Sequence, residues 1–162
     1  MIPDDVALRA LLEAIASDDD ETVSEQLRRH PDIVRWGLAK GATRAETYFL
    51  AEIGLTIYAG DTALHVAAAA YQSDLARKLI GMGADVRAKN RRGAEPLHSA
   101  TVGAPGERHW NPPAQVATIA CLIEAGANPD ATDKNGVTPL HRAIRNRCAA
   151  AVNALLEAGA DP

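Results

Sequence analysis

The chain has 162 residues, of which 47% are hydrophobic and 23% are charged, so it can form a folded domain with a core of its own. Its formal net charge is −4 at pH 7, which argues against general affinity for nucleic acid because phosphate binding normally needs a basic surplus. No apolar run reaches the length of a membrane span and the N-terminal residues are acidic, unlike a secretory signal, so we expect a cytoplasmic protein.

Residues 1–33 predict two helices joined by a short polar turn. Ala14, Ile15, Val23 and Leu27 have helical spacing, and the acidic run 18–21 falls where the second helix begins. Carboxylates at that end of a helix interact favourably with the positive end of the helix dipole. A calcium loop is excluded because its ligand spacing and central glycine are absent.

Residues 34–58 predict a further helix. Thr43 and Glu46 have the spacing of a capping box, and Tyr48, Phe49, Leu50 and Ile53 follow. We therefore expect a helical insertion in this segment.

One four-residue phrase occurs three times in residues 59–162, as Thr62–His65, Glu95–His98 and Thr138–His141. Each copy contains Leu-His and is followed by alanine and, further on, by Gly-Ala-Asp or Gly-Ala-Asn. The first two copies are 33 residues apart and the last two are 43 apart, so one unit carries an insertion of ten residues. A fixed period of about 33 residues is typical of stacked repeat proteins.

The phrase, the glycine and the period together resemble the ankyrin-repeat family. This resemblance implies an all-α solenoid of helix-turn-helix units with hairpin-like finger loops, which commonly binds other proteins through a concave groove. The expected units are a degenerate N-terminal capping repeat (1–33), the helical insertion (34–58), a repeat (59–90), a repeat with an enlarged inter-helix loop (91–133) and a last, truncated repeat (134–162).

Each phrase predicts the start of a helix, with a capping residue and a histidine at the third helical position. The expected structural caps are Thr62, His65, His98, Thr138 and His141. We expect no metal or catalytic role for these histidines, because residues one repeat apart lie in separate layers. The apolar residues of the helices, including Ile144 and Leu156 of the last unit, are expected to face inward.

The expected groove carries mostly arginine, whose planar guanidinium suits carboxylate and phosphate. The predicted groove residues are Arg87, Lys89, Arg91, Arg92, Glu95, Ser99, Arg142 and Arg145. An ordinary solvated face is the alternative to an acid-binding groove.

Large aromatic residues occur almost entirely where the chain departs from the repeat pattern. They are Trp36, Tyr48, Phe49 and Tyr58 in the first insertion, Trp110 in the second, and Tyr71 at a turn. Two roles are open: the rings anchor the inserted segments to an alanine-rich surface, or some of them, Trp110 first, are exposed anchors for a partner.

The sequence contains no recognisable catalytic or phosphate-loop motif, and we expect no enzyme activity, cofactor or metal. Cys121 and Cys148 lack metal-binding spacing and are expected to be buried thiols. The predicted function is a protein-binding scaffold whose partner presents an acidic segment.

Several alternatives stay open. They are a module for nucleic acid or a phosphorylated ligand, a host-directed bacterial effector fragment, and end-to-end self-association through the C-terminal repeat, whose last helix resembles an interior one. The chain is expected to be part of a longer protein or to have its last repeat covered by another chain. Thirteen arginines against four lysines, with many alanines, favour a bacterial source.

Overall fold

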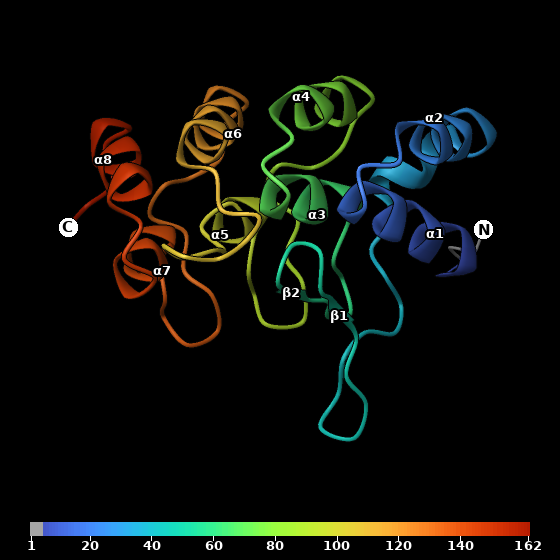
Figure 1. Cartoon of the computed structure of the whole chain (residues 1–162), viewed down its shortest axis with the longest axis horizontal. Helices are drawn as coiled ribbons and strands as arrows, with labels where there is room; N and C mark the ends of the chain where they lie inside the picture. The colour runs from blue at the N-terminus through green and yellow to red at the C-terminus, as the bar shows by residue number, and fades with distance from the viewer. Residues whose placement is uncertain (1–4) are drawn as a thin grey trace.

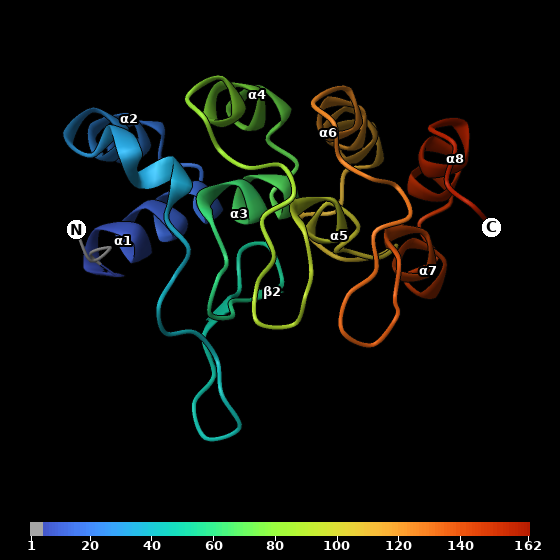
Figure 2. The ribbon, with the colours of Figure 1, turned by 180° about the vertical axis from the view of Figure 1, so that it is seen from behind.

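The computed structural model describes residues 5–162, which form four stacked pairs of α-helices. The first helices of the pairs lie in one row and the second helices in another, and the loops project from the first row away from the second (Figure 1; Figure 2 shows the same stack from behind). The first row contains α1 (Asp5–Ala16), α3 (Ala63–Ala69), α5 (Pro96–Ser99) and α7 (Pro139–Arg145). The second row contains α2 (Asp20–Arg29), α4 (Ser73–Gly81), α6 (Pro112–Glu124) and α8 (Ala149–Glu157). The predicted all-α repeat solenoid is confirmed.

The core runs through the stack as a series of thin layers. Helix α3 is buried over its whole length, because it lies between α1 and α5 in the first row and contacts α4 in the second. Alanine at most of its positions lets the neighbouring helices approach closely, and Leu64 fills the layer. Leu12, Leu97 and Leu140 occupy the same row in the other pairs.

The turn between the two helices of a pair has the same left-handed residue in three of the four pairs. Asp18, Tyr71 and Arg147 have φ values of 59°, 57° and 59°. The N–H of the next residue in each case bonds to the carbonyl five residues back, as in Asp19 to Ala14 at 2.9 Å. Residues 5–29 therefore share the local geometry of the repeats. The division of the chain into the five predicted units stays a prediction, and residues 1–4 of the first lie outside the described residues.

Helices α3 and α5 each carry a histidine in their first turn that also contacts the following repeat. The Nδ1 atom of His65 accepts the Thr62 N–H at 3.1 Å, and its Nε2 lies 3.0 Å from the Ala94 carbonyl. His98 does the same between the Glu95 N–H (3.1 Å) and the Val137 carbonyl (2.9 Å). Because Nδ1 is the acceptor, the proton is on Nε2, and each ring is the neutral tautomer that donates to the next layer.

The finger loops are hairpin-like, as predicted. In the first, the Asn90 N–H bonds to the Ala94 carbonyl at 3.0 Å, and in the second the Asp133 N–H bonds to the Val137 carbonyl at 3.0 Å. Neighbouring fingers are joined through the Lys134 N–H and the Arg92 carbonyl, also at 3.0 Å. The fingers therefore form one continuous edge of the molecule.

The predicted helix in residues 34–58 is wrong. The segment holds the 3₁₀ helix η1 (Pro31–Arg35), followed by an extended excursion in which β1 (Phe49–Leu50) pairs antiparallel with β2 (Leu55–Thr56). The Thr43 hydroxyl does accept the Glu46 N–H at 3.0 Å, but this motif closes a loop, because the Thr43 N–H bonds to the Glu46 carbonyl at 2.7 Å. A capping motif stabilises a turn whether or not a helix follows.

Two apolar residues of the last pair depart from the expected inward orientation. Ile144 is 56% exposed and Leu156 is 41% exposed. Both belong to the end pair, α7 and α8, whose outer side has no further layer of the described residues against it. Inward orientation in a stack requires a neighbour on both sides.

Candidate functional site

A polar depression lies on the loop side of the first helical row, between the β1–β2 excursion, the first finger and α7. We call it the arginine hollow and define it by Thr56, Tyr58, Arg92, Ser99, Arg142 and Arg145; its volume is about 300 Å³. The finger supplies Arg92, and α7 supplies Arg142 and Arg145 one turn apart on the same helix face. Three guanidinium groups from two elements thus line one depression.

Arg142 is the most enclosed of the three, with a side chain that is 25% exposed. Its Nη2 lies 3.5 Å from Asp133 Oδ2, and its Nη1 donates to the His98 carbonyl at 3.5 Å. Burial lowers the pKa of Arg142 from its usual value, and the nearby positive charges of Arg145 and Arg92 act in the same direction. Arg142 nevertheless remains a cation, because a guanidinium is not deprotonated in proteins, and it lies close to other positive charges.

Asp133 is held in place by its own finger loop. Its Oδ1 accepts the N–H groups of Asn135 at 2.8 Å and Val137 at 3.0 Å. Burial opposes ionisation of this carboxyl, but these two hydrogen bonds and the Arg142 charge together hold its pKa below the usual value. Asp133 is thus an ionised, fixed partner for one guanidinium of the hollow.

The remaining predicted groove residues do not all meet in the hollow. Arg91 donates to the Ala42 carbonyl at 2.9 Å, so it fastens the excursion to the first finger. Arg87 and Lys89 lie exposed on that finger, outside the hollow. Glu95 is only 1% exposed, which removes it from the accessible groove surface. Burial raises the pKa of Glu95, against the charges of Arg87 and Lys89, and its Oε2 has no hydrogen-bond partner among the described residues.

Most of the predicted aromatic residues anchor the inserted segments. The Tyr48 hydroxyl donates to Glu13 at 3.3 Å and its ring lies 4.5 Å from the Arg9 guanidinium, which ties the excursion to α1. The Tyr58 ring centroid lies 5.3 Å from the Arg92 guanidinium, at the wall of the hollow. Trp36 is half-buried and its ring centroid lies 5.9 Å from that of His30.

The second insertion is anchored in the same way. The Tyr71 hydroxyl donates to the Val102 carbonyl, and its ring stacks on His109 at 5.8 Å between centroids. The half-buried Trp110 donates from Nε1 to Gln115 at 3.3 Å. Phe49, at 51% exposure, is the most exposed of the predicted aromatic residues.

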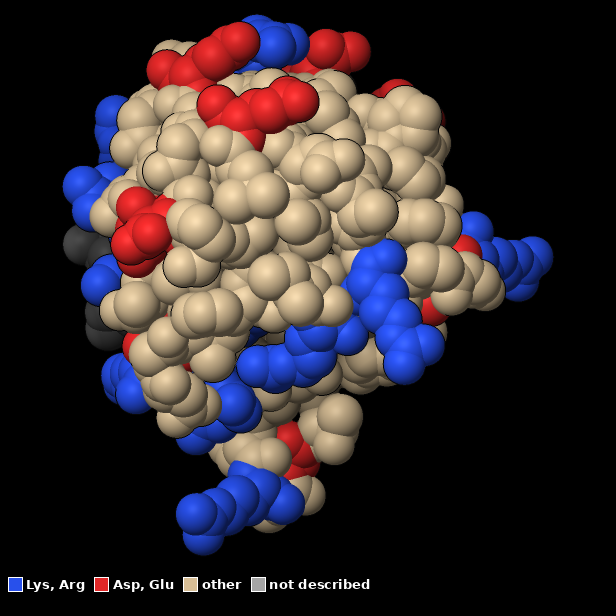
Figure 3. All heavy atoms as spheres, turned by 90° about the vertical axis from the view of Figure 1, so that its left-hand side faces the viewer, with Lys and Arg blue, Asp and Glu red and all other residues tan. Residues whose placement is uncertain are grey.

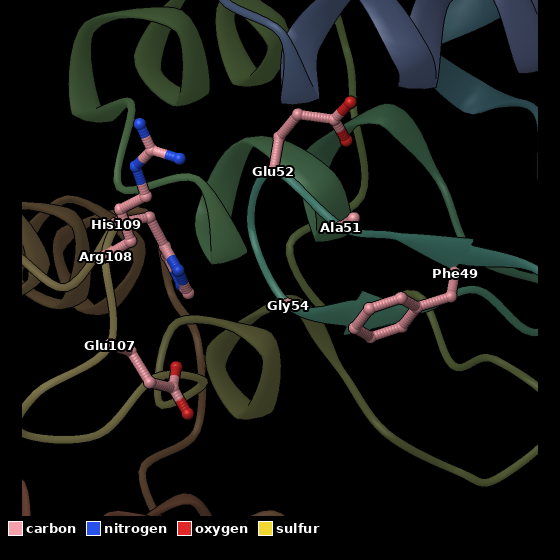
Figure 4. A pocket seen from close by; sticks show the side chains of 7 residues that line it. All are labelled: Phe49, Ala51, Glu52, Gly54, Glu107, Arg108 and His109. Atoms are coloured by element: carbon pink, nitrogen blue, oxygen red, sulfur yellow. The ribbon is translucent and has the colours of Figure 1, made fainter.

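The two insertions meet, which the sequence analysis did not anticipate. Together they line a second depression of about 530 Å³, which we call the junction pocket and define by Phe49, Ala51, Glu52, Gly54, Glu107, Arg108 and His109. The Glu107 and His109 side chains face the β1–β2 excursion across it, whereas the Arg108 guanidinium points away (Figure 4). His109 Nε2 is buried and has no hydrogen-bond partner among residues 5–162.

The junction pocket and the arginine hollow are neighbours, because Gly54 lines both. One is bordered by the carboxylates of Glu52 and Glu107 and the other by three arginines. The missed sequence signal was the stretch 55–58, in which Leu and Ile alternate with Thr and Tyr after a glycine with φ 62°. This pattern is typical of a strand after a tight turn.

The described residues contain neither a metal-ligand cluster nor an exposed thiol. Residues 5–162 contain no group of three or more His, Cys, Asp or Glu side chains placed to hold a metal ion. Both cysteines are buried, and burial raises the pKa of the Cys121 and Cys148 thiols, which disfavours the nucleophilic thiolate. In the same part of the chain, no helix has the length and apolar character to cross a membrane.

Two stretches of the chain match known sequence families. Residues 59–91 match the ankyrin repeat, and residues 122–162 match ankyrin repeats in many copies.

Individual relatives are similar over longer stretches. Ankyrin repeat and SOCS box protein 16 from Mus musculus is 37% identical over 103 residues, which is 62% of this chain and 22% of that protein. NF-kappa-B inhibitor delta from Mus musculus is 31% identical over 114 residues, 68% of this chain and 31% of that protein. E3 ubiquitin-protein ligase KEG from Arabidopsis thaliana is 30% identical over 153 residues, 94% of this chain and 8% of that protein. The chain thus spans less than a third of the length of each of these relatives.

Proposed function

This chain is an ankyrin-repeat protein, and we propose that it is a non-catalytic scaffold that holds another protein against its concave face, finger loops and two insertions. Ankyrin repeats generally mediate protein–protein interaction, and one similar protein, NF-kappa-B inhibitor delta, is named as an inhibitor. The observation that carries the proposal is the pair of adjoining depressions, because both are built from residues that interrupt or decorate the repeats.

The partner we propose presents an acidic segment to the arginine hollow. Arg92, Arg142 and Arg145 converge there, and arginine forms bidentate hydrogen bonds with carboxylates. The exposed Phe49 ring next to it supplies apolar contact area of the kind that anchors interfaces. Charge gives this site its selectivity and the ring contributes affinity.

Self-association is a second candidate, supported by the exposed face of the last pair. Ile144 and Leu156 lie exposed there, and His141, unlike the other two capping histidines, is exposed as well. Figure 3 shows that most of this face carries neither acidic nor basic side chains. We propose the cytoplasm as the location. A bacterial source stays a prediction from composition, and a host-directed effector role stays an open alternative.

Affinity purification from the native organism tests the main proposal. Wild-type chain is compared with Arg92→Ala/Arg142→Ala/Arg145→Ala and with Arg87→Ala/Lys89→Ala, which removes exposed charges outside the hollow. Proteins retained by wild type and by the control, but lost from the triple variant, are the expected result. Equal recovery of all bound proteins by the three baits, each with an unchanged circular dichroism spectrum, would refute the proposal.

A further inference from the structure

The guanidinium groups of the arginine hollow are not all neutralised by the protein. Arg142 faces Asp133, but within residues 5–162 neither Arg92 nor Arg145 forms an ion pair with a carboxylate. Asp61 also borders the hollow, yet its oxygens accept the Tyr58 N–H at 2.7 Å and the Asn90 amide at 2.8 Å. Two guanidinium groups are therefore left with their donors available.

The donors reach the hollow from different directions. Arg92 comes from the tip of the first finger, Arg142 and Arg145 come from α7, and Ser99 comes from α5. Thr56 and Tyr58 of the excursion form the opposite wall, so the depression is a receptacle for one group and not a flat basic face. Figure 3 shows a band of basic side chains across the lower part of the face seen from the C-terminal side, with further basic side chains at the top and edges of the view.

A phosphoryl group fits this arrangement better than a carboxylate. A phosphorylated side chain presents three terminal oxygens and a charge of about −1.5 to −2, whereas a carboxylate presents two oxygens and a single charge. Three guanidinium groups on two elements can each bond a separate phosphoryl oxygen, and hydrogen bonds between two ionised groups are among the strongest. The hollow, at about 300 Å³, has room for the phosphorylated end of a side chain.

The neighbouring junction pocket disfavours a nucleic acid at the same place. Glu52 and Glu107 border that pocket, and within the described part of the chain neither carboxylate forms an ion pair. A polynucleotide crossing the hollow would bring its next phosphates towards these two negative charges. A protein segment carries an isolated phosphate and can place a basic or apolar residue against Glu52 and Phe49.

We propose that the arginine hollow binds a phosphorylated side chain of a partner protein through Arg92, Arg142 and Arg145. The proposal rests on the protein-binding function above and narrows the chemistry of the partner. The residue next to the phosphorylated one lies over the junction pocket and is basic or apolar. Phosphorylation of the partner would then switch binding on.

Peptide libraries with one fixed central residue test the proposal. Five fluorescein-labelled libraries with degenerate flanks carry phosphoserine, phosphothreonine, phosphotyrosine, glutamate or serine at the centre, and binding is measured by fluorescence anisotropy. We expect at least one phosphorylated library to bind about tenfold more tightly than the glutamate library, since both charge and oxygen count increase. Selected sequences should be enriched in Lys, Arg or apolar residues on one side of the phosphorylated position.

Two double variants distinguish loss of the phosphate contacts from a general loss of charge or of folding. Arg92→Ala/Arg145→Ala removes the two guanidinium groups that have no carboxylate partner and should abolish the preference for phosphate. Arg87→Ala/Lys89→Ala should keep it. Equal preference in both variants would overturn the assignment of the donors.

The other outcomes are also decisive. Equal binding of the glutamate and phosphorylated libraries would overturn the phosphoryl assignment and leave the acid-binding scaffold intact. Tighter binding of a single-stranded oligonucleotide than of any peptide library would overturn the inference in favour of nucleic acid. Absence of binding to every phosphorylated library would overturn it as well, while loss of the native partners from the triple variant would still support the scaffold.

Discussion

Acidification below neutral pH should destabilise the fold through His98. His98 is fully buried, and burial lowers its pKa from 6.5 to about 4, with the Arg142 charge in the same direction and the Val137 carbonyl and Asp133 opposing. The unfolded chain therefore takes up the proton first. The free energy of unfolding should fall as pH drops from 6.5 to 4, by up to about 3 kcal/mol at 1.36 kcal/mol per pH unit.

Urea unfolding at intervals between pH 7.5 and pH 4 measures this loss. His98→Gln removes the titrating ring and should flatten the dependence in that window, although it lowers stability at pH 7. His141→Gln is the matched control, because His141 occupies the same position of its repeat but is exposed, and it should keep the wild-type slope. Identical pH dependence in wild type and His98→Gln would refute the reasoning.

Three further perturbations follow from the packing. Glu95→Thr should raise the melting temperature, because it removes a buried carboxylate oxygen without a hydrogen-bond partner and places a good N-cap there, for about 1 kcal/mol; a lower melting temperature would contradict this. Gly41→Ala should destabilise by about 1–3 kcal/mol in chemical denaturation, since its Cβ would lie 2.4 Å from the Tyr58 carbonyl carbon, whereas Gly81→Ala meets no atom within 4 Å and should not destabilise. Tyr48→Phe should cost about 1 kcal/mol and increase amide exchange in residues 48–57 if its hydroxyl fastens the excursion to α1; unchanged exchange would exclude that role.

The repeat architecture was readable because its determinants are local. The phrase Thr62–His65 specifies a capped helix start by its own side chains, and the period repeats that information along the chain. The inward positions follow from helical spacing wherever a layer has neighbours on both sides. Ile144 and Leu156 are exposed because burial requires an adjacent layer as well as helical spacing.

The insertions were misread for a related reason. The Thr43–Glu46 motif is compatible with a helix or a closed loop, and the choice depends on hydrogen bonds to residues far along the chain, such as Ala42 to Ile57. Helix propensity is weak enough for such contacts to override it.

The sequence by itself therefore determined that this protein is an all-α stack of repeats, with most of its large aromatic residues in the insertions. Only the tertiary structure decided which of those residues act together. It buried Glu95, used Arg91 and most of the rings as anchors, and joined Arg92 to Arg142 and Arg145 across two repeats. The physical reason is that a site is defined by distances between side chains. Those distances depend on how the excursion at residues 42–58 folds back against the second insertion, about fifty residues later in the chain.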